Sequence, residues 1–374
     1  MIKRVLILVA ALAAIATSVY FSPSISLTAG DATKPLSLSV AAADLKLVCP
    51  GAAVVSGGNN GTSVGTFARA GAAAVAGSAG GQSTSIRSLG ATGSTSQGAP
   101  SFSAKSPALI TLTTAAQGST ALNAGQLQLV ANSRLNGLMG ASCQAPATDI
   151  WLVGGDTSTG RETLLLLANP SQADATVGVT VIGLGGASAS SSGISVAAGG
   201  NQIVALSSVL PETKSIAVHI TSHGSAVGAW LQQRTLRGLS YAGADFVSPS
   251  PAFAKSLQVP GILVRGDHDA TALLAANADY FDLLPTLRVF NPNSKSITFV
   301  AQIFGADAKS FGTVVRDTVP ANSVSDFAIT GLQDGDYSAF ITADAAITAS
   351  VYWPARIKRT LPQPTSLGCL RRSR

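Results

Sequence analysis

The sequence predicts an all-β protein: two tandem immunoglobulin-like antiparallel β-sandwiches, preceded by a Gly/Ala/Ser-rich β region and by one N-terminal hydrophobic helix. Three observations predict this fold. Charged residues make up only 11% of the 374 residues, against roughly 25% in an average domain. Apolar residues alternate with polar ones between Gly- and Pro-containing turns, as in short strands. A set of landmarks also repeats once in the second half of the chain.

Residues 1–22 have the layout of an export signal. Lys3 and Arg4 precede an uncharged run from Val5 to Phe21, close to the lower limit of about 20 residues for crossing a bilayer. Ala14-Ile15-Ala16 is a candidate cleavage site, whereas the apolar residues after it favour an uncleaved signal anchor. Both alternatives export everything after residue 22, either anchored in the cytoplasmic membrane by the N-terminus or secreted after cleavage.

Cys49 and Cys143 are predicted to form a disulfide, because export places them in an oxidising compartment. Closing so long a loop stabilises a fold by about 4–5 kcal/mol in the chain-entropy model. Two buried free thiols are the alternative. Cys369, the third cysteine, lies in the basic tail and is expected to be unpaired.

Residues 23–44 are predicted to be a linker, and residues 45–148 the Gly/Ala/Ser-rich β region. This region contains no Asp or Glu, which excludes carboxylate acid/base chemistry and hard-metal binding within it. Residues 108–113 and 126–131 alternate and are expected to be strands. Residues 90–105 are expected to be a mobile loop.

Residues 149–250 and 251–355 are predicted to be two copies of one sandwich, the first and second repeats. An apolar strand ends at Asn169-Pro170 in one and at Asn291-Pro292 in the other, and an alternating strand follows in each. The two Asn-Pro pairs are offset by 122 residues, and other landmarks keep nearly the same offset. The paired landmarks include Gly183 with Gly305 and Trp230 with Trp353.

The physical chemistry of these strands supports two-layered sheets. Val177, Val179 and Val181 project to one face with period two and need a second sheet to cover them. Proline ends the preceding strand because it donates no ladder hydrogen bond. Trp230 and Trp353 are expected to fill equivalent sites in the inter-sheet cores.

One phrase of the first repeat resembles a known family. Its residues are Trp151-Leu-Val-Gly-Gly155, Thr159-Gly160-Arg161 and Leu165 to Pro170, together with Cys49-Pro50-Gly51, Cys143 and Leu236-Arg237-Gly238-Leu239. Over residues 45–355 the chain resembles the actinobacterial exported envelope proteins catalogued as domain of unknown function 5719. The resemblance implies an N-terminally anchored envelope protein, and a membrane glycosyltransferase as partner through gene neighbourhood. It implies no catalytic residue.

Three groups of polar residues resemble metal or catalytic sites, but their patterns favour structural roles. His219 and His223 lack a third metal ligand, so a strand residue and a loop residue are expected. Asp267-His268-Asp269 lies in an expected loop, where side chains adjacent in sequence converge poorly for catalysis. Asp334-Gly335-Asp336 lacks the later oxygens of a calcium loop and favours a hairpin turn with a left-handed glycine.

Trp151 and Arg161 mark the best candidate surface for a ligand or partner. An exposed Trp stacks on sugar faces, and Arg binds hydroxyls or carboxylates. The alternative is that Trp151 anchors a core where two domains meet. Gly154-Gly155-Asp156 beside them has neither a Lys nor a following helix start, so it does not match a phosphate-binding loop.

The composition narrows the function classes. The net charge of +6 comes from Lys3, Arg4 and the basic tail, residues 356–374; the body is slightly acidic, which argues against a nucleic-acid partner. The tail is expected to be a solubilising end or a contact to wall polymers. We expect a non-enzymatic, membrane-anchored envelope protein acting as accessory or scaffold, without cofactor or metal. A carbohydrate-binding module for an envelope polysaccharide is the alternative, and a hydrolase using Asp267, His268 or Asp282 the third reading.

Overall fold

The computed structural model describes residues 44–57, 65–80, 84–90, 95–97, 101–113, 121–238, 240–277, 280, 283–306 and 312–352. All of them belong to one compact unit, Ala43–Arg374. The expected N-terminal helix, nearly all of the linker and the basic tail lie outside the described residues, as do Trp353, Asp282 and Cys369. Within the described part of the chain, no helix is long and apolar enough to cross a membrane.

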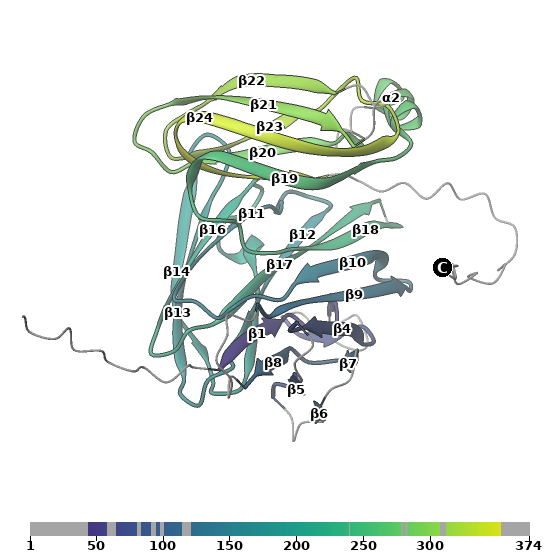
Figure 1. Cartoon of the computed structure of the whole chain (residues 1–374). Helices are drawn as coiled ribbons and strands as arrows, with labels where there is room; N and C mark the ends of the chain where they lie inside the picture. Colours follow the sequence, from purple (N-terminus) through teal and green to yellow (C-terminus); the bar gives the residue numbers. More distant parts are fainter. Residues whose placement is uncertain are drawn as a thin grey trace, which may run out of the picture. The chain divides into compact units, whose positions relative to one another are not determined.

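The described residues are mostly β, arranged in several antiparallel sheets and a nearly closed barrel-like sheet (Figure 1). One α-helix is described, α2 (Asp267–Ala276), besides the short 3₁₀ turn η1 (Leu206–Ser208). The expectation of a loop at Asp267-His268-Asp269 is therefore wrong, because this triplet begins α2 after Gly266, whose φ is 72°. A left-handed glycine there lets the chain turn from strand into helix.

Residues 45–148 form two small four-stranded sheets and a hairpin. One sheet has the order β1-β8-β5-β6: Leu45–Cys49, Ala108–Leu112, Ser85–Ser88 and Thr95–Gln97. The other has the order β10-β9-β4-β7: Asn136–Ser142, Asn123–Ala131, Ala73–Ser78 and Phe102–Ala104. The hairpin pairs β2 (Val54–Ser56) with β3 (Phe67–Arg69). The mobile loop expected at residues 90–105 is thus wrong in part, because β6 and β7 lie within it.

The first repeat contains two four-stranded sheets that face each other. The order of one is β11-β16-β13-β14: Asp149–Val153, Ala217–His223, Ala175–Ile182 and Ser188–Val196. The order of the other is β15-β12-β17-β18: Asn201–Ala205, Arg161–Ala168, Gly228–Arg237 and Ser240–Val247. Val177, Val179 and Val181 are buried against Leu165 and Leu167 in the core between them. The period-two prediction for these valines is confirmed.

The second repeat places its strands in one six-stranded sheet. They are β19 (Ala254–Val264), β20 (Thr286–Asn291), β21 (Ile297–Gly305), β22 (Thr313–Val319), β23 (Ser323–Ala328) and β24 (Gly335–Tyr352). The first half of β24 pairs with β19 and β21, and its second half with β20. The three neighbours of β24 therefore correspond to β11 and β13, which flank β16, and to β12, which flanks β17; among the described strands, β18 has no counterpart beside β24.

The two Asn-Pro landmarks share three hydrogen bonds. Asn169 and Asn291 are fully buried, and each Nδ2 donates to the carbonyl four residues later, at 2.8 Å in both cases. Each also donates to the carbonyl of the valine that ends the fourth strand of its repeat, Val196 of β14 at 3.0 Å and Val319 of β22 at 3.1 Å. Each Oδ1 accepts a backbone N–H two residues on. The asparagine thus holds the turn and a neighbouring strand end together.

Trp230 does not lie where the sequence predicted. Its strand β17 buries Ala229 and Leu231 in the core between the two sheets, so Trp230 points to the opposite face. There it is covered by residues 45–148 and is fully buried, and its indole N–H donates to the Ser142 carbonyl at 3.0 Å. The sheet that contains β12 and β17 is therefore buried on both faces, which explains the uninterrupted Leu164–Leu167 run.

Candidate functional site

Trp151 lies where the two repeats meet. Its ring stacks on His219 with centroids 4.1 Å apart and on Phe290 with centroids 5.0 Å apart, while Phe253 approaches it edge-on. Phe290 belongs to β20 of the second repeat and also packs with Val153 of the first. The rings that surround Trp151 thus belong to the protein itself. This geometry matches the alternative of a domain anchor better than that of a sugar-stacking platform.

A polar contact accompanies this aromatic cluster. Arg288 of β20 donates to both carboxylate oxygens of Asp326 on β23, at 2.7 and 2.8 Å, and to the Gly155 carbonyl of the first repeat at 2.6 Å. Asp326 also accepts from the Ser215 hydroxyl across the same boundary. The planar guanidinium therefore satisfies a carboxylate and a carbonyl together, which a lysine ammonium does less well. Gly155, which lies in a segment that does not match a phosphate-binding loop, is here an acceptor for the second repeat.

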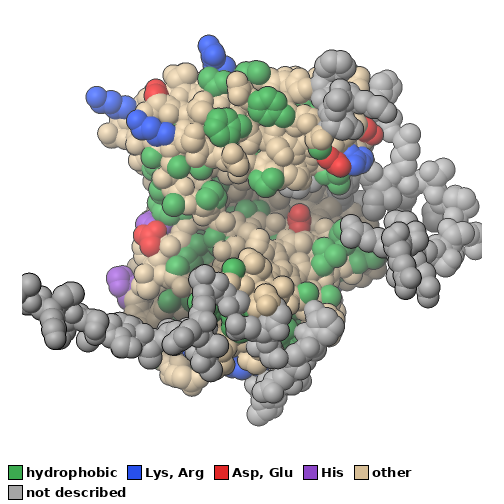
Figure 2. Space-filling view, in the orientation of Figure 1, with side chains coloured by type: hydrophobic (Ala, Val, Ile, Leu, Met, Phe, Trp, Pro, Cys, Tyr) green, Lys and Arg blue, Asp and Glu red, His purple; other side chains and the backbone are tan. Residues whose placement is uncertain are grey.

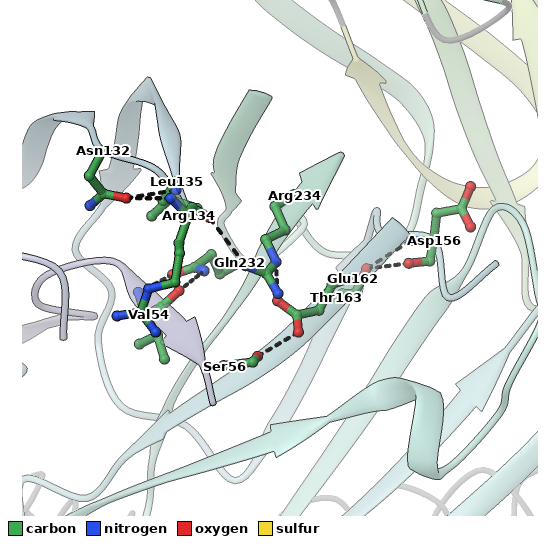
Figure 3. Close-up of polar contacts among 10 residues, drawn as sticks. All are labelled: Val54, Ser56, Asn132, Arg134, Leu135, Asp156, Glu162, Thr163, Gln232 and Arg234. Carbon is green, nitrogen blue, oxygen red and sulfur yellow. Dashed lines mark hydrogen bonds and ion pairs between the residues drawn. The ribbon is translucent and has the colours of Figure 1, made fainter. Parts of the chain in front are cut away.

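Arg161 begins β12, in the sheet opposite β11 and Trp151, and one of its donors reaches the Gly160 carbonyl at 3.1 Å. Its neighbour Glu162 points to the other face and forms an ion pair with Arg234 of β17, with Nε and Oε2 2.5 Å apart. Ser56 of β2 donates to the other oxygen of Glu162. Figure 3 shows Glu162 between Arg234 and Ser56, with the three side chains converging from different strands.

Ser56, Glu162 and Arg234, which we call the Glu162 cluster, join residues 45–148 to the first repeat. Arg234 also donates to the Arg134 carbonyl in the β9–β10 turn at 3.2 Å, and its guanidinium lies 5.3 Å from the Tyr241 ring centroid. Both members of the ion pair are mostly buried. Breaking a pair of this kind by removing one partner is strongly destabilising, since the remaining charge is left without compensation. The cluster can fix the position of three segments.

Three buried glutamines provide the backbone partners of residues 51–54. Gln126 of β9 accepts from the Gly51 N–H and donates to its carbonyl, at 2.9 and 2.8 Å. Gln128 accepts from the Ala53 N–H at 2.7 Å. Gln232 of β17 accepts from the Val54 N–H and donates to the Val54 carbonyl, at 2.6 and 2.7 Å. Each side-chain amide therefore makes hydrogen bonds that a neighbouring strand would otherwise make. These bonds satisfy backbone groups that would be buried without partners.

Arg69 completes this enclosure from β3. It donates to the carbonyls of Pro50 and Ala52 at 2.9 and 2.6 Å, and to Asn201 of the first repeat at 3.2 Å. Burial removes water from the guanidinium and lowers the pKa of Arg69 to about 10. The group stays charged at neutral pH, and it stabilises the segment through donors to uncharged oxygens.

The other sequence groupings do not converge. His219 and His223 lie in one strand, β16, four residues apart, so their backbones are separated by roughly 13 Å, too far to share a metal ion. His219 instead contacts Asp149 at 3.1 Å. The left-handed glycine expected at Gly335 is in fact Gly331, with φ 76°, because Gly335 already begins β24. Among the described residues, no group of three or more His, Cys, Asp or Glu side chains could hold a metal ion.

The predicted disulfide between Cys49 and Cys143 is confirmed. The two Cα atoms are 4.3 Å apart, at the short end of the distances found for bridged cysteines. Cys49 ends β1, Cys143 follows β10, and both are buried in the core shared by the two small sheets. The bridge therefore links the edge strands of these sheets across a sequence separation of 94 residues.

Sequence reasoning missed the Glu162 cluster and the three glutamines. One signal pointed to the first: Glu162 is one of only two glutamates in the chain, and a charge beside an apolar strand needs a partner. The glutamines gave no such signal, because a Gln that alternates with Leu is typical of a strand with its leucines facing the core. In β9 the leucines face outward and the glutamines inward.

Comparison with known proteins identifies the family. The model of the Family of unknown function (DUF5719) matches residues 91–364, and the chain belongs to that family. The match includes both repeats and the last part of the preceding β region; Cys49 lies before it and Cys143 within it. No curated protein and no solved structure matches the chain.

Proposed function

We propose that this member of the DUF5719 family is a non-enzymatic protein of the cell envelope. It is exported, anchored in the cytoplasmic membrane by residues 1–22, and acts as an accessory or scaffold for envelope components. One observation carries the proposal: the polar side chains that converge in the described residues join one segment of the chain to another. The Glu162 cluster and the Arg288–Asp326 pair are of this kind.

We further infer that residues 149–250 and 251–355 are immunoglobulin-like sandwiches produced by duplication. The supporting evidence is the matching strand neighbours and the shared hydrogen bonds of Asn169 and Asn291. Gly199 and Asn322, which follow the fourth strands β14 and β22, both have positive φ, 65° and 45°. Each donates its N–H to the residue two after the asparagine, Ser171 or Asn293, at 3.0 Å. Four features that depend on local geometry thus recur at nearly one offset.

The glycan-binding alternative has less support. Its main residue, Trp151, has one ring face stacked on His219 and the other contacts are Phe290 and Phe253. A sugar would have to displace one of these rings. A membrane glycosyltransferase, by contrast, needs only a rigid surface at which to be held, and it stays a candidate partner.

The scaffold proposal is tested by photo-cross-linking in intact cells. A photoreactive amino acid at Leu184, an exposed side chain of the first repeat, is compared with the same amino acid at buried Leu165 as the matched control. We expect one membrane or envelope protein to be captured at residue 184 and none at residue 165. The anchoring is tested by alkaline carbonate extraction of the membranes, which an uncleaved anchor resists.

Two results would count against the proposal. Capture of envelope polysaccharide in place of protein, lost in Trp151→Ala, would favour the binding-module alternative. Recovery of the whole chain in the culture medium with a shortened N-terminus would replace the anchor by a cleaved signal peptide.

A further inference from the structure

The outward face of the β10-β9-β4 sheet is apolar and uncharged. Leu127 and Leu129 of β9 are 53% and 70% exposed, and Leu138 of β10 is 59% exposed. Leu129 and Leu138 are direct cross-strand partners, and Leu127 lies opposite Gly140. Exposed Ala74 of β4 is the other neighbour of Leu127. We call Leu127, Leu129 and Leu138 the leucine face.

The leucine face is a consequence of the buried glutamines. Because β9 turns Gln126 and Gln128 inward to pair with residues 51–54, period two forces Leu127 and Leu129 outward. A one-residue shift in register would bury the leucines and expose the glutamines, as an ordinary strand does. The chain therefore keeps apolar side chains in water where the usual arrangement would hide them, and contiguous exposed apolar surface of this kind marks interaction sites.

The charges of the surrounding region favour one kind of occupant. Residues 45–148 contain no acid, and their five cations are Lys46, Arg69, Arg87, Lys105 and Arg134. Arg69 is used internally, whereas Lys46 and Lys105 are exposed. A carboxylate that contacts β10 is Asp245 of β18, which accepts from the Gly140 N–H at 3.0 Å. In the view of Figure 2, acidic side chains are sparse and hydrophobic ones lie among uncharged ones.

The chain before this region also favours a membrane surface. An uncharged apolar run, Val5 to Phe21, precedes residues 22–44, which lead directly into β1. Fully extended, residues 22–44 span at most roughly 80 Å, so an anchored chain keeps the start of β1 within that distance of the bilayer. Apolar side chains combined with cations are the combination that binds anionic lipid surfaces.

We propose that the leucine face docks on an anionic phospholipid surface, with Leu127, Leu129 and Leu138 inserted among the head groups. This inference rests on the proposed membrane anchoring, which holds the face close to the bilayer. The docked face would orient the two repeats relative to the membrane, which a flexible linker alone does not do.

The test uses the full chain reconstituted into vesicles, with Cys369→Ser as the background so that one introduced cysteine is labelled. Leu129→Cys carries an environment-sensitive fluorophore, and the vesicles contain phospholipids with a quencher on the acyl chain. The matched control is Val314→Cys, because Val314 is 60% exposed on β22 of the second repeat. Vesicles contain phosphatidylglycerol or, in the second arm, phosphatidylcholine only.

We expect quenching at residue 129 to be several-fold greater than at residue 314 in phosphatidylglycerol vesicles, and to fall in phosphatidylcholine vesicles. Leu127→Glu combined with Leu138→Glu should remove the difference, whereas Val314→Glu in the Leu129→Cys chain should not. Carbonate extraction of the same vesicles reports anchoring separately. Anchored protein with equal quenching at the two positions overturns the docking alone. Protein that is extracted but still quenched at residue 129 overturns the anchor alone, and protein that does not bind vesicles overturns both.

Discussion

The strands β12 and β20 show how one surface can be covered in two ways. Each ends at the Asn of an Asn-Pro pair or just before it, and each turns alternate residues away from its own core. In β12 the outward residues are Leu164, Leu166 and Ala168, which residues 45–148 cover. In β20 the corresponding residues are Thr286, Arg288 and Phe290, and the latter two contact the first repeat.

The difference separates a shared core from a junction between neighbours. The β12 face lies in a broad apolar core with Trp230 at its centre, so residues 45–148 and the first repeat are expected to unfold together. The β20 face offers one aromatic ring and one guanidinium, which is typical of smaller, more polar contacts between domains. Each repeat thus contacts the part of the chain before it with the same strand, but with different strength.

The largest effect is expected from a substitution that disrupts the core shared by residues 45–148 and the first repeat. Trp230→Ala should lower the free energy of unfolding by about 3–5 kcal/mol, because a fully buried indole and its hydrogen bond to Ser142 are lost. Chemical denaturation measures it. Phe304→Ala is the matched control, since Phe304 is 55% exposed, and should change stability by no more than about 0.5 kcal/mol. A cost below about 1 kcal/mol for Trp230→Ala would mean that the shared core does not exist in solution.

Substitution of Asn169 and Asn291 tests whether the turns that the two repeats share contribute equally to stability. Asn169→Ala and Asn291→Ala should each cost roughly 2–3 kcal/mol, because each removes the side-chain hydrogen bonds to the carbonyl four residues later and to the strand-ending valine, together with the bond from one backbone N–H. Asn136→Ala, at an exposed position of β10, serves as control. Equal losses are expected in equilibrium unfolding. A clear loss at one asparagine and none at the other would contradict the idea that the two turns are equivalent.

The polar half of the second contact is weaker. Arg288→Ala should cost about 1–2 kcal/mol, because its pairing with Asp326 is partly screened by solvent while its bond to the Gly155 carbonyl lies between the repeats. We expect calorimetry to show the second repeat melting earlier and separately from the first. Arg316→Ala on the exposed face of β22 should leave the profile unchanged. A single, unshifted transition for Arg288→Ala would show that Phe290 and Trp151 suffice.

The smallest expected effect depends on pH. Asp245 of β18 bonds to Gly140 of β10, and burial raises its pKa from 3.8 to about 6, while the Gly140 and Phe246 N–H groups act in the opposite direction. The raised pKa means that the folded state holds a proton that the unfolded state releases, so this group's contribution to stability is present below about pH 4 and is lost as pH rises to 6.

Asp245→Asn should therefore flatten the change in unfolding free energy between pH 4 and pH 7 and make the protein slightly more stable at pH 7. The surrounding protein desolvates the Asp245 carboxyl group, but the residue as a whole stays accessible to solvent, so we expect a change of less than about 1 kcal/mol. Asp317→Asn, on the exposed face of β22, is the control. A variant whose pH profile is steeper than that of the natural chain would reverse the sign of this argument.

The sequence predicted what depends on local pattern. The valines of β13 and the Asn-Pro turns follow from spacing and residue type, and the pairing of Cys49 with Cys143 follows from the predicted export and from the position of the third cysteine in the tail. It failed where the answer depends on what covers a face. The sequence predicts Trp230 in the core between the two sheets of the first repeat. Alternation indicates which residues of a strand share a face, but it does not show which face another part of the chain covers. The same ambiguity hid the inward glutamines of β9, whose partners are backbone groups more than 70 residues away.

The glutamine bridge to Val54 also sets an order of events during synthesis. Gln232 follows Val54 by 178 residues, which a ribosome needs roughly 10–35 s to add. Val54 is therefore synthesised well before Gln232, its hydrogen-bonding partner. Contacts between residues so far apart in the sequence also form slowly. Cys143 follows Cys49 by only 94 residues. If the chain is exported during its synthesis, in line with the proposed function, the disulfide would be able to close before β17 is available to complete the region that it links.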